Sequence, residues 1–229
     1  MDTEPGEHLP IDCDYEDRVV ERLSVLEARV TAKLSKLNTS STEEESRLFE
    51  RAVKSPTVAK RVFWLRQAAE RVQAKVMPVA ACRSGCSHCC HVAVLVSRPE
   101  AMTIAREIGA EIDRSAGRYS VQNTDDFGAQ QAQLAKDYAG SACPFLAGGR
   151  CSIYAHRPLA CRLLINLDDD DLLCQSPSGT HTPMLDVMEH NVLKMLALGV
   201  NQDFDDIRRW FPRASRDLAT SRSSGNSSK

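Results

Sequence analysis

The sequence lacks a long apolar run and a strong charge of either sign. Its 229 residues carry a formal net charge of −2, so no overall field attracts nucleic acid or an anionic membrane. No apolar stretch approaches the roughly 20 residues that cross a bilayer. Residues 1–14 lack the basic region and apolar stretch of a secretion signal. We therefore expect a cytoplasmic protein with neither a nucleic-acid nor a membrane partner, and its actual partners stay unknown.

Recognisable catalytic motifs are also missing. The chain has no glycine-rich phosphate loop, no nucleotide fingerprint, no His-Glu-x-x-His and no Gly-x-Ser-x-Gly. Catalytic residues are therefore unknown. Cysteine, in contrast, is plentiful, with nine residues. An odd number of cysteines in a reducing compartment fits poorly with a disulfide framework and favours metal ligands or redox groups.

The apolar residues recur at helical spacing over most of the first third of the chain. One stripe predicts a helix from Tyr15 to about residue 37, and a second predicts a helix between Pro56 and Pro78. A capping box of Ser41 and Glu44 opens a helix between them. The two stripes could form a hairpin within the chain or the seam of a homodimer. About three heptads is short for a coiled coil, which favours the hairpin.

The rest of the sequence predicts a mainly α protein with a loop-rich cysteine module that is held together by metal. Gly-Gly between the two apolar arms of 143–154 predicts a small β-hairpin. Further expected elements are an extended segment at 92–97, helices at about 98–112, 126–139, 184–199 and 203–211, a short helix within 155–166, and loops at 115–125 and 168–171, the latter acidic and solvated. The expected regions are a disordered lead (1–14), an N-terminal helical region (15–79), the cysteine module (80–175), C-terminal helices packing on it (176–212) and a disordered tail (213–229).

Eight of the nine cysteines fall within the module, in two groups. The first group has the pattern C-x3-C-x2-C-C, at Cys82, Cys86, Cys89 and Cys90. The second is spread out, at Cys143, Cys151, Cys161 and Cys174. A two-residue gap, as between Cys86 and Cys89, lets both sulfurs reach one ion. Adjacent cysteines tend to point apart, so Cys89 and Cys90 serve two centres, or one ligand role and one packing role, more readily than one ion. Cys13 stands outside the module and is interpreted as a bystander.

These motifs resemble a known family. The 82–90 cluster, "CPFL" and "GRCSIYAHRPLACR" are similar to the YkgJ-type cysteine-cluster family of zinc- or iron-chelating CxxCxxCC proteins. The resemblance covers about residues 80–175 and is most specific from Cys151 to Arg162. It implies that the seven cysteines from Cys82 to Cys161 are ligands, while Cys174 matches a less regular final cysteine. The first gap, of three residues, departs from the two of the family pattern.

The spacing leaves two metals open. Zinc sites built from four cysteines usually use two C-x2-C knuckles, and this chain has one. Widely spread thiolates suit an iron–sulfur cluster at least as well, so we slightly prefer that cofactor over zinc. Arg157 and Arg162 lie in the matched motif and are candidate cofactor contacts, since a guanidinium offsets thiolate charge. His88 and His91 could replace a thiolate, although an ordinary turn position is the preferred interpretation.

Three functions remain at this point. The first is a metal-binding protein with a structural or redox centre. The second is an enzyme, for which the nearest analogues are the flagellin lysine N-methylases; these carry a similar cysteine domain associated with an iron–sulfur cluster. The third is a metal carrier with exposed thiolates. A polar cleft beside the cysteines would favour an enzyme, and a closed site a structural role. In every case we expect at least six of the eight cysteines to converge in space.

Overall fold

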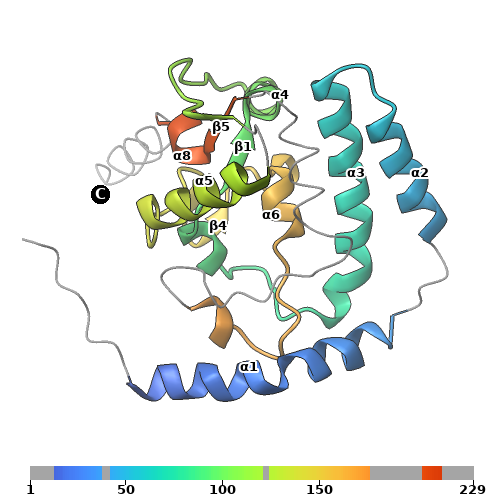
Figure 1. Cartoon of the computed structure of the whole chain (residues 1–229), viewed down its shortest axis with the longest axis vertical. Helices are drawn as coiled ribbons and strands as arrows, with labels where there is room; N and C mark the ends of the chain where they lie inside the picture. The colour runs from blue at the N-terminus through green and yellow to red at the C-terminus, as the bar shows by residue number, and fades with distance from the viewer. Residues whose placement is uncertain (1–12, 38–41, 121–123, 176–202, 213–229) are drawn as a thin grey trace, which may run out of the picture.

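The protein is mainly helical with a small β-hairpin, as the sequence predicts, and it also contains a three-stranded antiparallel sheet. A computed structural model describes residues 13–37, 42–120, 124–175 and 203–212. In Figure 1, α2 and α3 form one side of the molecule and α1 runs beneath the cysteine module. The predicted helix at 184–199, the tail at 213–229 and most of the lead lie outside the described residues.

Two N-terminal helices form a hairpin, although the predicted hairpin paired the apolar stripe of 15–37 with that of 56–78. They are α2 (Thr42–Val53) and α3 (Val58–Val76), which pack side by side (Figure 1). The Thr57 hydroxyl accepts the Lys60 backbone N–H and caps α3, and the 3-10 turn η1 (Met77–Val79) follows it. Buried residues of the hairpin pack against the module through Leu159 and Leu163. Within the described ranges, no helix has the length and apolarity needed to cross a bilayer.

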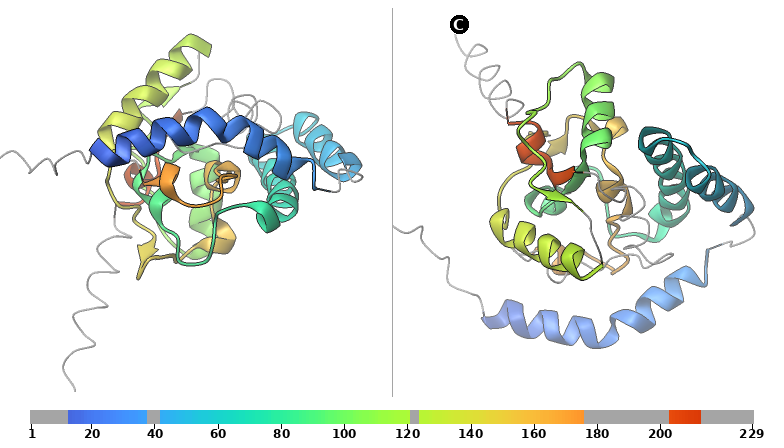
Figure 2. Two further views of the ribbon diagram at one scale, coloured as in Figure 1. Left: turned by 90° about the horizontal axis from the view of Figure 1, so that it is seen from below. Right: turned by 45° about the horizontal axis from the view of Figure 1, so that its top comes forward.

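The first helix, α1 (Cys13–Leu34), packs along the cysteine module. Its buried Val19 contacts Leu172 and Leu173, and its C-terminal half covers Val76 and Ile165. Seen from below, α1 crosses over the short turn η4 (Leu172–Cys174) (Figure 2). The apolar stripe is thus covered within the chain, and a homodimer through these helices stays a prediction.

A three-stranded sheet joins distant parts of the chain. Its order is β1 (Leu95–Ser97), β5 (Asp203–Asp206) and β2 (Tyr119–Ser120), all antiparallel. This corrects two predictions, because 203–206 is a strand rather than part of a helix, and 119–120 lies in the sheet rather than in a loop. Within the predicted helix at 203–211, only the single turn α8 (Ile207–Trp210) is helical.

The cause of the wrong prediction is long-range pairing. The Asp206 carboxylate accepts the Val94 N–H at 2.7 Å, and that of Asp205 accepts the N–H groups of Gly117 and Arg118 at 3.2 Å. Both carboxylates are fully buried. These partners lie about a hundred residues away in sequence, so local periodicity contains no sign of them.

The other elements follow local signals. The helix α4 (Arg98–Ile108) starts after Ser97, whose hydroxyl accepts the Glu100 N–H, and ends at Gly109 with φ 68°. The predicted hairpin consists of β3 (Leu146–Ala147) and β4 (Arg150–Cys151), with two positive-φ glycines between them. The remaining elements are α5 (Thr124–Asp137), η2 (His88–His91), η3 (Tyr154–His156) and α6 (Leu159–Leu163).

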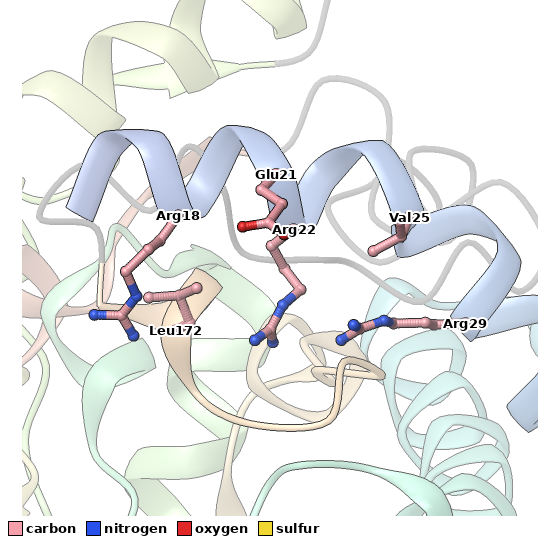
Figure 3. A pocket seen from close by; sticks show the side chains of 6 residues that line it. All are labelled: Arg18, Glu21, Arg22, Val25, Arg29 and Leu172. Carbon is pink, nitrogen blue, oxygen red and sulfur yellow. The ribbon is translucent and has the colours of Figure 1, made fainter. Parts of the chain in front are cut away.

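The acidic loop at 168–171 is held by cations from α1. Asp168, expected in solvent, is fully buried and accepts Arg22 at 2.6 Å and Arg29 at 3.3 Å. The Lys33 ammonium donates to the Asp168 carbonyl at 2.6 Å. Figure 3 shows Arg22 and Arg29 extending from α1 toward the loop that carries Leu172, beside a pocket of about 220 Å³. These contacts fasten α1 over the end of the module.

Replacing Asp168 with Asn should lower the free energy of unfolding by about 2 kcal/mol, because the substitution removes the buried negative charge that accepts hydrogen bonds from two guanidinium groups. Urea denaturation measures the effect. Glu50→Gln, which breaks a solvent-exposed pair with Lys54, is the matched control and should change little. Equal stabilities of the two variants would contradict the clamp.

Candidate metal centre

Seven cysteines line one cavity of about 490 Å³. They come from four separate segments: the 82–90 loop, the turn before β3, strand β4 and helix α6. The seven are Cys82, Cys86, Cys89, Cys90, Cys143, Cys151 and Cys161. The fold therefore collects both sequence groups around the same space.

Cys174, the eighth cysteine, is linked to this set by Asn166. The Asn166 backbone N–H donates to the Cys82 sulfur at 3.3 Å, and its side-chain amide donates to the Cys174 sulfur at 3.0 Å. Cys174 is not among the lining residues. Sequence reasoning did not single out Asn166, since an asparagine in a loop has no distinctive spacing.

Tight turns shape the 82–90 loop. Gly85 has φ 90°, a conformation that other residues rarely adopt. The Cys86 N–H donates to the Arg83 carbonyl at 3.1 Å, and the Cys90 N–H donates to that of Ser87 at 2.9 Å. The Cys143 N–H in turn donates to the Cys90 carbonyl at 2.7 Å. Two cysteines 53 residues apart in the sequence are thus joined through their backbones.

Arg208 fastens the same two loops from the far end of the chain. Both Asp206 carboxylate oxygens accept its guanidinium at 2.9 Å. The guanidinium donates to the carbonyls of Cys90 at 3.1 Å, Val92 at 3.2 Å and Ala142 at 3.1 Å, and also to that of Ser141. Sequence reasoning missed this positioning residue, because 203–211 has the pattern of an ordinary short helix.

Glu100 positions the helix that carries Cys161. Its carboxylate is buried and accepts the Leu159 N–H at 2.8 Å, at the start of α6. The Ser97 hydroxyl accepts the Glu100 N–H at the start of α4, and the Glu100 side chain reaches Leu159. Burial raises the pKa of this carboxyl above its ordinary value.

The two candidate arginines occupy different places. Arg157 lines the cavity, stacks on the Tyr154 ring at 3.6 Å and donates to the Gln73 side chain at 3.0 Å. Arg162 is buried and not among the lining residues. Its guanidinium donates to the carbonyls of Arg157 at 3.0 Å and Ala155 at 2.6 Å. Arg162 thus supports the turn that presents Arg157, and its expected contact with the centre stays a prediction.

Most of the thiols hold their protons in this environment. Burial raises the pKa of Cys143 to about 11 and that of Cys174 to about 12. Cys89 differs: the Cys90 thiol donates to its sulfur and Arg157 is near, which together lower the Cys89 pKa to about 7. Donating that hydrogen bond raises the pKa of Cys90. The adjacent cysteines thus contact each other at the wall of the same cavity, and the expectation that they serve two centres stays a prediction.

The charged groups around the cavity are positive. Arg83, Arg150 and Arg157 line it, whereas the described lining residues include no Asp or Glu. His88 contacts the Asp171 carboxylate at 3.1 Å and His91 contacts the Ser87 carbonyl at 3.2 Å, and neither lines the cavity. The surroundings therefore suit a group that carries the negative charge of several thiolates.

The donor set fits zinc or iron in chemistry, since thiolates are soft ligands for both. Sulfurs that share one zinc ion lie within about 4 Å of each other, given zinc–sulfur bonds of about 2.3 Å. In the described part of the chain, no three Cys, His, Asp or Glu side chains are grouped closely enough to hold one ion. The thiols instead surround a volume. To bind a single zinc ion, the cysteine side chains would have to move closer together. An iron–sulfur cluster, in contrast, fills the space between its cysteine ligands.

Comparison with known families agrees with this chemistry. Residues 81–177 match the CxxCxxCC family, described as a "putative zinc- or iron-chelating domain". The match covers nearly the same residues as the resemblance found in the sequence and leaves out α1, α2, α3 and 203–212. This segment is thus similar to the cysteine-cluster domain of that family. No curated protein and no solved structure was found to match the chain.

Glu100 variants should separate its acceptor role from its charge. Glu100→Leu leaves the Leu159 N–H without its acceptor and should lower the free energy of unfolding by about 2 kcal/mol. Glu100→Gln keeps an oxygen that can accept this hydrogen bond. Because the folded-state pKa of Glu100 is raised, wild type should lose stability relative to Glu100→Gln as pH rises from its unfolded value of 4.5 through the raised value. Urea denaturation at pH 5 and pH 8 tests this. An unchanged difference between wild type and Glu100→Gln would refute the buried charge.

Proposed function

We propose that the domain binds metal through the seven cysteines of the cavity together with Cys174, and that the bound group is of the iron–sulfur type. The observation that carries the proposal is the convergence of seven thiols from four segments on one cavity. When bound, such a group supplies a redox-active cross-link between those segments. Arg157 would offset part of its negative charge from the cavity wall.

Two features support iron–sulfur over zinc. The cavity volume of about 490 Å³ far exceeds the space of a single ion, and no three donors are already gathered around a point. Each iron of a cluster carries its own thiolate, so the ligands stand farther apart than at one zinc ion. The second cysteine group also lacks a C-x2-C knuckle.

A structural or redox role suits the surroundings of the cysteines. The segments that hold them are turns, a two-residue hairpin and short helices, which contribute few ladder hydrogen bonds. Metal binding would therefore supply much of their folding free energy. Cys89 is exposed, which gives an electron-transfer partner or an oxidant access to the centre. Free thiols in this number also favour a reducing compartment such as the cytoplasm.

An enzyme resembling the lysine N-methylases is the second candidate. The cavity is open, has a volume typical of small-molecule sites, and includes Tyr154, Gln73 and Arg157 among its polar groups. A substrate could then lie beside the metal, over the thiols. A purely structural centre would have a closed, dry site instead.

Metal analysis of anaerobically purified protein tests the proposal. We expect iron and acid-labile sulfide in similar amounts and a broad absorbance near about 400 nm from thiolate-to-iron charge transfer. Cys151→Ser should lower the iron content, while the matched Cys13→Ser control should not. Zinc without iron would overturn the choice of cofactor, and protein that binds neither metal would overturn metal binding itself.

Removal of the metal should loosen the module before the helices beside it. Hydrogen exchange should rise first at 82–91 and 143–163, because the metal supplies their cross-links. The α2–α3 hairpin has its own buried contacts and should stay protected. Exchange measured with and without a chelator gives the comparison. Equal protection in both samples would argue against a structural metal.

A further inference from the structure

We infer that the eight cysteines form two separate centres. The first consists of Cys82, Cys86, Cys89 and Cys174, and the second of Cys90, Cys143, Cys151 and Cys161. This inference rests on the proposed function and deepens it, since it assigns each thiol to one of two metal groups. The division runs between the adjacent residues Cys89 and Cys90.

The first set is assembled by Asn166 and by the apolar cluster under α1. Asn166 donates to the sulfurs of both Cys82 and Cys174, which places the first and last cysteines of the module side by side. Cys82 packs against the cluster that contains Val76, Ile165 and Leu167. Cys86 and Cys89 belong to this set by their two-residue gap, which directs two sulfurs to one metal group.

The second set is assembled by backbone pairing and by a different apolar cluster. The Cys90 carbonyl accepts the Cys143 N–H at 2.7 Å. The Cys143 carbonyl accepts the Leu146 N–H, and Leu146 pairs with Cys151 across the hairpin. Cys143, Cys151 and Cys161 all pack against the cluster that includes Trp210. The two sets therefore belong to different packing units of the fold.

Arginines of the cavity wall lie beside both sets. Arg83 follows Cys82 in the sequence and pairs at 3.3 Å with Asp171, three residues before Cys174. Arg157 stacks on Tyr154, three residues after Cys151, and is fixed by the segment that leads to Cys161. Two groups of thiolates within one cavity repel each other, and the guanidinium groups of the cavity wall offset part of that repulsion.

Paired variants test the division on the full chain. Cys82→Ser with Cys174→Ser should remove the first centre, and Cys151→Ser with Cys161→Ser the second. Each double variant should retain about half of the wild-type metal per chain, with Cys13→Ser as the unchanged control. Loss of all metal in both variants would indicate one shared centre and overturn the inference. Full metal content in either variant would overturn it as well.

Stepwise removal of metal from the wild-type protein provides a test that needs no substitution. A chelator is added in limiting amounts, the freed thiols are alkylated, and each cysteine is quantified by peptide mass spectrometry. Two centres predict two groups of four cysteines, with the thiols of each group becoming reactive together. All eight becoming reactive in one step would overturn the division. Wild type that contains no metal would instead overturn the proposed function, so the two failures are distinguishable.

Discussion

The hydrogen bonds of Arg208 are the constraint on which the cysteine module depends. The loops before Cys143 and after Cys90 have carbonyls outside the regular helices and strands. The Arg208 guanidinium donates hydrogen bonds to four of them. Asp206 holds that guanidinium in place and also accepts the Val94 N–H. Without this contact, these carbonyls would lose a partner, and only the hydrogen bond from the Cys143 N–H to the Cys90 carbonyl, among those described above, would join the two cysteine loops.

Other buried polar side chains extend the same principle. Arg162 satisfies the carbonyls of Ala155 and Arg157, Glu100 satisfies the N–H at the start of α6, and Asn166 donates to two sulfurs. A module built from turns thus uses charged and amide side chains where a regular fold uses ladder hydrogen bonds. These contacts position the segments that carry the cysteines.

The same environment links metal binding to proton release. Burial raises the pKa of most of the thiols, so a metal must displace protons from them, and binding strengthens as pH rises. Cys89 differs from the other thiols, since its pKa is lowered and its side chain is exposed. The helix α1, clamped on Asp168, covers the module near Cys174.

The sequence by itself determined the elements whose signals are local. Apolar periodicity and capping residues predicted α2 and α3, Gly-Gly predicted the β3–β4 hairpin, and the spacing of the cysteines predicted the family of the central domain. Each of these signals acts over a few residues or is repeated within one motif.

Only the tertiary structure decided what the distant segments do to one another. It turned 203–206 into a strand, gave Arg208 its carbonyls 116 and 118 residues away, and paired Arg162 with the carbonyls of Ala155 and Arg157. It also buried Asp168 beneath α1. A single sequence does not contain these pairings in any local pattern, because an arginine or a carboxylate has the same identity whether solvent or a distant backbone group satisfies it. The partner is chosen only when the chain folds and burial makes an unsatisfied polar group too costly.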